Sequence, residues 1–305
     1  MRVVTLLPSA TEIVYGLGLE PVGVSHECSY PPAAAAKPSI NRSRVDSTAS
    51  CADIDDAVHE AEDEHGGVYE IDYDALRDAD PDLIITQGVC DVCAVDSVLV
   101  EEAVEDLGLD ADILTTDAHS LGDILDDIRR IGTATGTPDR AAELESNLRS
   151  RIRRVEHRAA EADTTPRVCV LDWMDPVMVA GHWIPEMVEL TGGTYGITDP
   201  GGYSKPTDWE TVLDFDPEVM ITAPCGFSLD QSLEHSNELT DRERWDSLSA
   251  VRDGRVYAMD GDSYVNCPSP RMVDTLEYLA GLIHPALFDL PPKDVSRSLS
   301  TLRPA

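Results

Sequence analysis

The sequence has little positive charge, few aromatic side chains and no long apolar run. Lys+Arg total 23 against 58 Asp+Glu, and lysine occurs only at Lys37, Lys205 and Lys293, so the formal net charge is −35. Such an excess of carboxylates repels phosphate backbones and anionic lipids, which excludes nucleic acid and membrane surfaces as expected partners. Acids spread evenly along the chain indicate a halophilic, acidic proteome, because high salt screens their mutual repulsion.

No stretch approaches the roughly 20 apolar residues that a spanning helix needs, so direct membrane insertion is not expected. Residues 1–8 are typical of a buried strand and lack the charged region, apolar core and cleavage site of a signal peptide. The sequence as written therefore predicts a cytoplasmic location. The alternative is an extracellular, membrane-associated protein with a leader encoded upstream.

Common enzyme motifs are also missing. The chain has no phosphate loop, no Gly-x-Gly-x-x-Gly after a strand and no Gly-x-Ser-x-Gly turn. The chain therefore offers none of these enzyme sites, and whether it is an enzyme stays open at this point.

Short apolar segments alternate with helical patterns along most of the chain. This alternation predicts an α/β fold with parallel sheets. The expected strands are 2–7, 22–25, 81–86, 112–115, 167–171, 217–223 and 256–259, and the expected helices include 9–17, 72–79, 139–162, 183–191, 209–213 and 271–283.

The region 119–163 interrupts the alternation. Its last part, 139–162, has few apolar positions and many Arg and Glu residues, which predicts a long, solvated helix. We therefore expect an N-terminal α/β lobe at 1–118, a rigid linking helix at 119–163 and a C-terminal α/β lobe at 164–305.

The two lobes contain the same helix-to-strand unit. It begins at Asp80-Pro81-Asp82 in the first lobe and at Asp216-Pro217-Glu218 in the second, and each copy leads to a cysteine, Cys90 or Cys225. Ligands of open α/β sheets bind beyond the carboxyl ends of strands. Two facing lobes would place these strand ends around a ligand cleft between them.

With Leu7-Pro8-Ser9-Ala10-Thr11-Glu12, Tyr30-Pro31-Pro32 and Ser269-Pro270-Arg271, these repeated units resemble the substrate-binding proteins of cobalamin and iron-siderophore ABC importers. The nearest likeness is to a leaderless subgroup labelled cobalamin-binding. The resemblance implies two α/β lobes of the periplasmic-binding-protein type joined by a long helix. It also implies a metal-chelate ligand between the lobes and an ABC permease as partner.

The resemblance also implies roles for single residues. Tyr30 and Asp262 match ligand contacts, and Asp74 and Glu210 match carboxylates that dock on the membrane partner. Where such proteins often carry an arginine after the Asp262 position, this chain has Val265-Asn266-Cys267-Pro268.

A set of metal-binding side chains follows the predicted strands. Imidazole and thiolate together suit Zn²⁺ or an Fe–S cluster, although Cys-x-x-Cys is equally typical of a redox dithiol. The candidate ligands are His26, Cys28, Cys90, Cys93 and Cys225.

The scarce aromatic residues supply further candidates. Trp173 and Trp183 flank a predicted strand end, where flat rings can stack on a macrocycle, and His182 lies beside them. Cys51, Cys169 and Cys267 are expected to pack in the core, and His119 and His235 to lie on the polar surface.

These observations leave three hypotheses. The leading one is a binding protein for a corrinoid (cobalamin) or related metal chelate. The alternative is a cytosolic metal- or Fe–S-dependent enzyme or redox protein on the same fold, and the third is an intracellular metal or cofactor chaperone.

Overall fold

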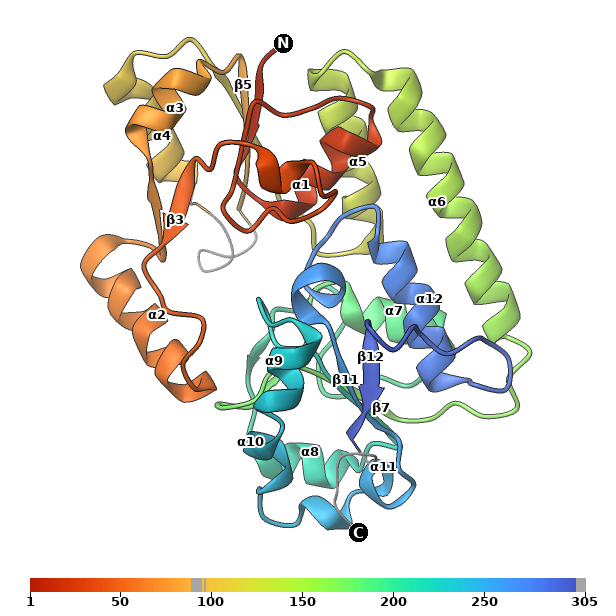
Figure 1. Ribbon diagram of the computed structural model, residues 1–305. Helices are drawn as coiled ribbons and strands as arrows, with labels where there is room; N and C mark the ends of the chain where they lie inside the picture. Colours follow the sequence, from red (N-terminus) through yellow and green to blue (C-terminus); the bar gives the residue numbers. More distant parts are fainter. Residues whose placement is uncertain (89–94, 96, 300–305) are drawn as a thin grey trace. The chain divides into compact units, whose positions relative to one another are not determined.

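The computed structural model describes residues 1–88, 95 and 97–299 of the chain (Figure 1). Cys90 and Cys93 lie outside the described residues. The chain divides into two compact units, the first formed by 1–49, 53–118 and 122–147 and the second by 50–52, 119–121 and 148–305. Each unit contains helices packed on a largely parallel sheet, so the predicted α/β class is confirmed.

The first unit is built on a four-stranded sheet with the order β2-β1-β5-β6. All its strand pairs are parallel. Helices α3 and α4 lie on one face and α1 and α5 on the other (Figure 1). The strands are β1 (Val3–Thr5), β2 (Gly23–Val24), β5 (Leu83–Gln87) and β6 (Asp112–Thr116), and the helices α1 (Pro8–Gly16), α3 (Tyr73–Ala79), α4 (Ser97–Leu107) and α5 (Leu121–Ala134).

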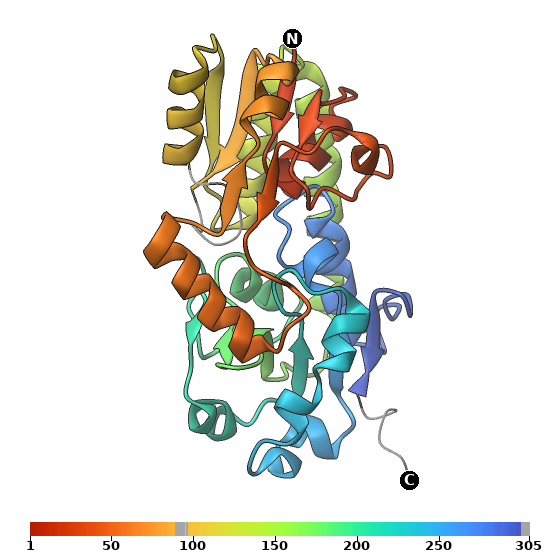
Figure 2. The same ribbon diagram turned by 60° about the vertical axis from the view of Figure 1, so that its left-hand side comes forward.

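A smaller antiparallel sheet pairs β3 (Asn41–Ser43) with β4 (Tyr69–Ile71). Helix α2 (Cys51–His65) lies between these strands in the sequence (Figure 2). The sequence predicted none of these three elements. Both strands have only three residues, and α2 is so rich in acids that its apolar periodicity is weak.

The second unit is built on a six-stranded sheet with the order β12-β11-β10-β7-β8-β9. Its centre is parallel, since β10 pairs in parallel with β7 and with β11, whereas β8, β9 and β12 are antiparallel additions. The strands are β7 (Val168–Trp173), β8 (Met178–Val179), β9 (Lys205–Pro206), β10 (Val219–Thr222), β11 (Val256–Met259) and β12 (Ser296–Ser298).

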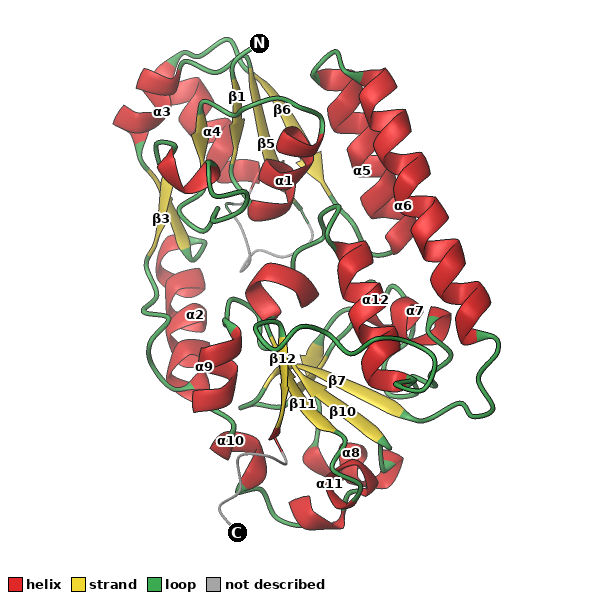
Figure 3. Ribbon diagram, turned by 45° about the vertical axis from the view of Figure 1, so that its right-hand side comes forward, coloured by secondary structure: helices red, strands yellow, loops and turns green. Residues whose placement is uncertain are grey.

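Helices cover both faces of this sheet, with α7 and α12 on one side and α8 and α11 on the other (Figure 3). A capping box between Ser228 and Gln231 begins α9. The helices are α7 (Ile184–Leu190), α8 (Trp209–Phe215), α9 (Leu229–Glu234), α10 (Asn237–Thr240), α11 (Ser249–Arg252) and α12 (Met272–Ile283).

The predicted long helix is α6 (Pro138–Ala159). Its buried apolar side chains form one narrow stripe at Ala141, Leu148, Val155 and Ala159. The boundary between the two units falls inside this helix, between residues 147 and 148. The segment predicted as one linker, 119–163, thus contains both α5 and α6. No helix among the described residues is long and apolar enough to cross a membrane.

The internal repeat includes the residues at the C-terminal ends of two equivalent helices, α3 and α8. α3 and α8 both end at an aspartate with left-handed backbone, Asp80 (φ 40°) and Asp216 (φ 44°). In the first unit Arg2 Nε donates to the carbonyls of Ala79 (2.8 Å) and Asp80 (2.9 Å).

The second unit repeats this contact. Arg167 Nε donates to the carbonyls of Phe215 and Asp216, each at 2.9 Å. In each unit, the arginine directly before the first strand therefore donates to the last carbonyls of the equivalent helix. The C-terminal end of a helix carries a partial negative charge, so it interacts favourably with a cation. This shared contact fixes each helix to its sheet.

We expect Arg167→Met to lower the free energy of unfolding by about 1–3 kcal/mol, because it leaves two helix-end carbonyls without a charged donor. Thermal unfolding measures the effect. Arg42→Met is the control, since Arg42 makes only an exposed pair with Glu70 whose loss costs about 0–1 kcal/mol. Equal losses in the two variants would contradict the capping role.

Candidate functional site

The carboxyl ends of β7, β10 and β11 bring three loops together in the second unit. The register pairs Thr222 of β10 with Leu171 of β7 and with Ala258 of β11, so all three strands end at one edge. Beyond this edge, Cys225 N–H donates to the Asp172 carbonyl (3.0 Å) and Asp262 N–H to the Phe227 carbonyl (3.1 Å). Three predicted positions thus lie at this edge: Trp173 ends β7, Cys225 lies on the loop after β10, and Asp262 lies in the π-helical turn Gly261–Val265 after β11.

The two predicted tryptophans are buried in this part of the unit. Trp173 packs against Phe227 with ring centroids 5.4 Å apart, and its Nε1–H donates to the Asp175 carbonyl (3.1 Å). Trp183 donates from Nε1 to the Val265 carbonyl (3.0 Å). Both indoles are held by backbone carbonyls, which fixes their rings as rigid apolar surfaces.

His182 has a backbone conformation that few non-glycine residues adopt. Its φ is 52°, in the left-handed region, which costs on the order of 1–3 kcal/mol and persists only where neighbours hold it. The loop at 201–202 does so, because His182 N–H donates to the Gly202 carbonyl (2.5 Å) and Gly201 N–H to the His182 carbonyl (3.0 Å). Strain of this kind is typical of functional positions.

Gly181 makes the approach of this loop feasible. A Cβ at Gly181 would lie 2.2 Å from the Gly202 carbonyl oxygen and 2.6 Å from the Ser204 nitrogen. Any larger residue would therefore push the 202–204 segment away from His182.

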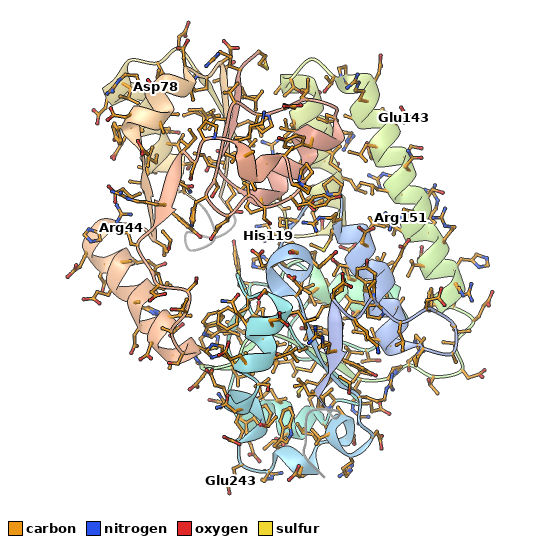
Figure 4. The ribbon with its side chains drawn as sticks, in the orientation of Figure 1. Arg44, Asp78, His119, Glu143, Arg151 and Glu243 are labelled. Carbon is orange, nitrogen blue, oxygen red and sulfur yellow. The ribbon has the colours of Figure 1, made fainter. Side chains whose placement is uncertain are left out.

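His182 belongs to a cluster with His119 and Tyr203. His119, labelled in Figure 4, comes from the segment between β6 and α5. Its Nδ1 lies 3.2 Å from Nδ1 of His182. Tyr203 meets both imidazoles edge to face, at 5.2 and 5.4 Å, and Trp183 packs on His182 at 5.6 Å. We name His119, His182, Trp183 and Tyr203 the aromatic cluster.

The contact between the two imidazoles has a chemical consequence. A hydrogen bond between two Nδ1 atoms requires one ring to donate and the other to accept. In the neutral pair the donating imidazole then carries its lone pair on Nε2, which is the atom that binds metals most often. The pair therefore sets up one ring as a nitrogen ligand. Tyr203, whose side chain is 62% exposed, is the cluster's most accessible member.

Asp172 lies next to the aromatic cluster through Ser204. Gly181 N–H donates to Ser204 Oγ (2.9 Å), and Ser204 hydrogen-bonds the Asp172 carboxyl. Asp172 Oδ1 is buried and has no hydrogen-bond partner among the described residues. Burial raises the pKa of Asp172 to about 6, so this carboxyl holds a proton more readily than a solvated one.

The candidates of the first unit follow β2. Cys28 is buried, its Sγ lies 3.0 Å from Thr11 Oγ1, and burial raises its pKa to about 12. A thiol held this way is protonated at neutral pH and inert unless a metal displaces the proton. His26 Nδ1 lies 3.2 Å from Asn41 Oδ1, and Tyr30 is exposed.

The predicted metal-ligand set stays a prediction. Cys90 and Cys93 lie outside the described residues, and Cys225 is half-buried at its loop. None of the five described cysteines forms a disulfide, and Cys51, Cys169 and Cys267 are buried as expected.

The two docking candidates occupy equivalent places in the repeat. Asp74 lies in the first turn of α3 beside Arg77, and Glu210 lies in the first turn of α8 beside Arg244. Both carboxylates are exposed, and their docking role stays a prediction.

Sequence reasoning missed His119, Tyr203 and Asp172. His119 was expected on the polar surface, yet it is half-buried against His182. His119 comes shortly after β6, and ligands of α/β sheets bind beyond strand ends, so its position after a strand is the one sequence signal that could have identified it. Nothing local to Tyr203 indicated that its loop folds back over Gly181.

We expect Asp172→Asn to change how stability depends on pH. A carboxyl whose pKa is raised on folding binds its proton more tightly in the native state, so stability falls as pH rises from about 4 to 6. The asparagine variant lacks this loss, so its free energy of unfolding should rise relative to that of the parent by about 2 kcal/mol between pH 4 and 7.

Melting temperatures of both proteins across this range measure the difference. Burial also raises the pKa of Asp127 to about 6. Asp127 is present in both proteins, so its contribution cancels in the difference between their melting temperatures. A difference that stays constant with pH would contradict the assignment.

Comparison with known proteins finds relatives that align with nearly the whole chain. The chain is 23% identical over 294 residues to an uncharacterized ABC transporter substrate-binding lipoprotein of Bacillus subtilis, covering 94% of this chain and 81% of the relative. It is 25% identical over 283 residues to the vitamin B12-binding protein of Vibrio cholerae, covering 90% and 86%.

Solved structures show the same fold. The apo periplasmic heme-binding protein of Roseiflexus sp. RS-1 matches with a TM-score of 0.70 at 21% identity, covering 94% of this chain and 98% of that one. The periplasmic vitamin B12-binding protein of Vibrio cholerae matches with a TM-score of 0.66 at 23% identity, covering 93% and 97%.

The periplasmic binding protein family matches residues 3–263, which is most of the chain. The resemblance predicted from the repeated strand units is therefore confirmed, and the chain belongs to the periplasmic binding protein family.

Proposed function

We propose that this chain is the receptor of an ABC importer and that it binds a metal-bearing tetrapyrrole, with a corrinoid as the first choice and haem as the second. The observation that carries the proposal is the aromatic cluster. It combines a paired imidazole, an exposed phenol and a buried indole within one group of loops.

The chemistry of a metal-bearing tetrapyrrole suits this cluster. The macrocycle is flat and apolar, and aromatic rings offer it stacking surfaces at little entropic cost because they are already held. Its cobalt or iron takes an axial nitrogen or phenolate ligand. The imidazole pair presents such a nitrogen, and Tyr203 a second candidate ligand.

The relatives narrow the ligand class in the same direction. Among them are vitamin B12-binding proteins of Vibrio cholerae and a high-affinity heme uptake protein of Staphylococcus aureus, the latter 23% identical over 147 residues. Both ligands are metal-bearing tetrapyrroles. The relatives therefore support a metal-bearing tetrapyrrole as the ligand class more strongly than they support either vitamin B12 or haem alone.

Two residues bear on the choice between corrinoid and haem. Asp262 is half-buried in the π-helical turn Gly261–Val265 that follows β11, where the resemblance implies a contact with corrin side chains. The segment Val265-Asn266-Cys267-Pro268 stands where such proteins often have arginine, and Asn266 Nδ2 donates to the Ala223 carbonyl (2.9 Å). A corrinoid would therefore meet Asp262 without the usual arginine beside it.

The receptor role implies a permease as partner and an extracellular site of action. The Bacillus subtilis relative is a lipoprotein by name, so the comparisons give the cytoplasmic expectation no support. Asp74 and Glu210, in matching first turns of α3 and α8, are the proposed docking carboxylates. The placement of the ligand between the lobes, with Tyr30 as a contact, remains part of this proposal.

Titration with aquocobalamin and with haemin in molar KCl tests the ligand. We expect binding at one equivalent for one of them, with an absorption change because a protein ligand replaces water on the metal. His182→Asn should remove or strongly reduce the absorption change and weaken binding at least 10-fold. Asparagine tolerates the left-handed backbone, so this variant removes the imidazole with little added strain.

His157→Asn is the matched control, because His157 lies exposed on α6. It should bind as the parent does. Absence of heat and of any spectral change with both compounds would overturn the proposed ligand class. Binding that His182→Asn leaves intact would overturn the role of the cluster.

A further inference from the structure

A second group of metal-binding side chains, made of residues outside the predicted ligand set, lies in the second unit. Cys51 is the first residue of α2, His235 follows the end of α9, and Glu238 lies in the first turn of α10. One ligand atom from each residue lies within 4.8 Å of the others. It is the one group of three such ligands within the ranges 1–88 and 97–299.

The contacts within this group converge on Glu238. Cys51 N–H donates to Glu238 Oε1 (3.3 Å), and His235 Nδ1 lies 3.0 Å from the same oxygen. The other oxygen, Oε2, is buried and has no hydrogen-bond partner among the described residues. A buried carboxylate oxygen without a partner costs on the order of 1–3 kcal/mol.

Burial distinguishes this group from an exposed cluster of acids. Cys51 is fully buried, and the side chains of His235 and Glu238 are only 18% and 16% exposed. His235 also packs on Phe227 with ring centroids 5.2 Å apart, and Phe227 packs on Trp173. The three donors are therefore held by packing and point to one small volume.

We propose that Cys51, His235 and Glu238 bind a zinc ion. Thiolate, imidazole and carboxylate are the three ligand types of zinc sites, and three protein ligands leave a fourth position for water. Ligand atoms around a tetrahedral zinc lie roughly 3.5 Å apart at ordinary bond lengths. Small side-chain rotations would bring these three donors to that spacing.

Charge balance supports a divalent ion. Zinc would replace the thiol proton of Cys51, which leaves to solvent, and would bind neutral His235 and ionised Glu238. The two negative charges then cancel the charge of the ion, so the buried site becomes neutral. The ion would also satisfy Glu238 Oε2.

A competition titration tests the site in the full chain. Cys90→Ser/Cys93→Ser is the background, because that pair could bind zinc independently. In this background, zinc with a chromophoric chelator should show one tight equivalent per chain, and cobalt should show thiolate-to-metal absorption. Cys51→Ala should abolish both signals, and Glu238→Gln should weaken zinc binding at least 10-fold.

Cys267→Ala is the control, since Cys267 is an equally buried cysteine outside the group. It should keep the tight equivalent. Melting curves without metal show that each variant folds, and zinc should raise the melting temperature of the background but not of Cys51→Ala. A tight equivalent that survives Cys51→Ala, or its absence from the background protein, would overturn the proposal.

Discussion

The parallel pairing of β7, β10 and β11 is the constraint on which the site of the second unit depends. Because the three strands run in one direction, their following loops leave the sheet at the same edge. Asp172, Cys225 and Asp262 meet there although they are far apart in the sequence. The sheet thus supplies a rigid frame, and the candidate side chains come from the segments that follow its strands, among them His182 with its left-handed backbone.

The repeated units made the fold predictable. In both units one helix ends and the next buried strand begins at the same short motif, Asp80-Pro81-Asp82 or Asp216-Pro217-Glu218. The contacts of Arg2 and Arg167 with the helix-end carbonyls are repeated as well. Most helices and the buried central strands were therefore predicted, but the 15-residue α2 was not, because its many acids weaken its apolar periodicity. Strands β3, β4, β8, β9 and β12 were not predicted, because each has two or three residues that are not all buried and so form no apolar run, unlike β1 and β2.

The site was only partly predictable. His182 and Trp183 follow a strand and begin a helix, so their place could be inferred from local order. His119 and Tyr203 reach the same cluster from separate loops, and no local pattern records that. Local sequence also gave no sign of the neighbours of Cys51. This residue was expected only to pack in the core, yet it lies against His235 and Glu238. Cys28 shows the reverse, because its burial against Thr11 could not be inferred from its strand-end position.

We propose that the aromatic cluster serves to capture a metal-bearing tetrapyrrole. The most direct measurement is the identity of the ligand carried by the protein isolated from its native cells, extracted and analysed by mass spectrometry with metal quantification. We expect a cobalt corrinoid or an iron porphyrin at near one equivalent. A ligand of another class, such as a sugar, a peptide or a metal-free organic acid, would contradict this proposal.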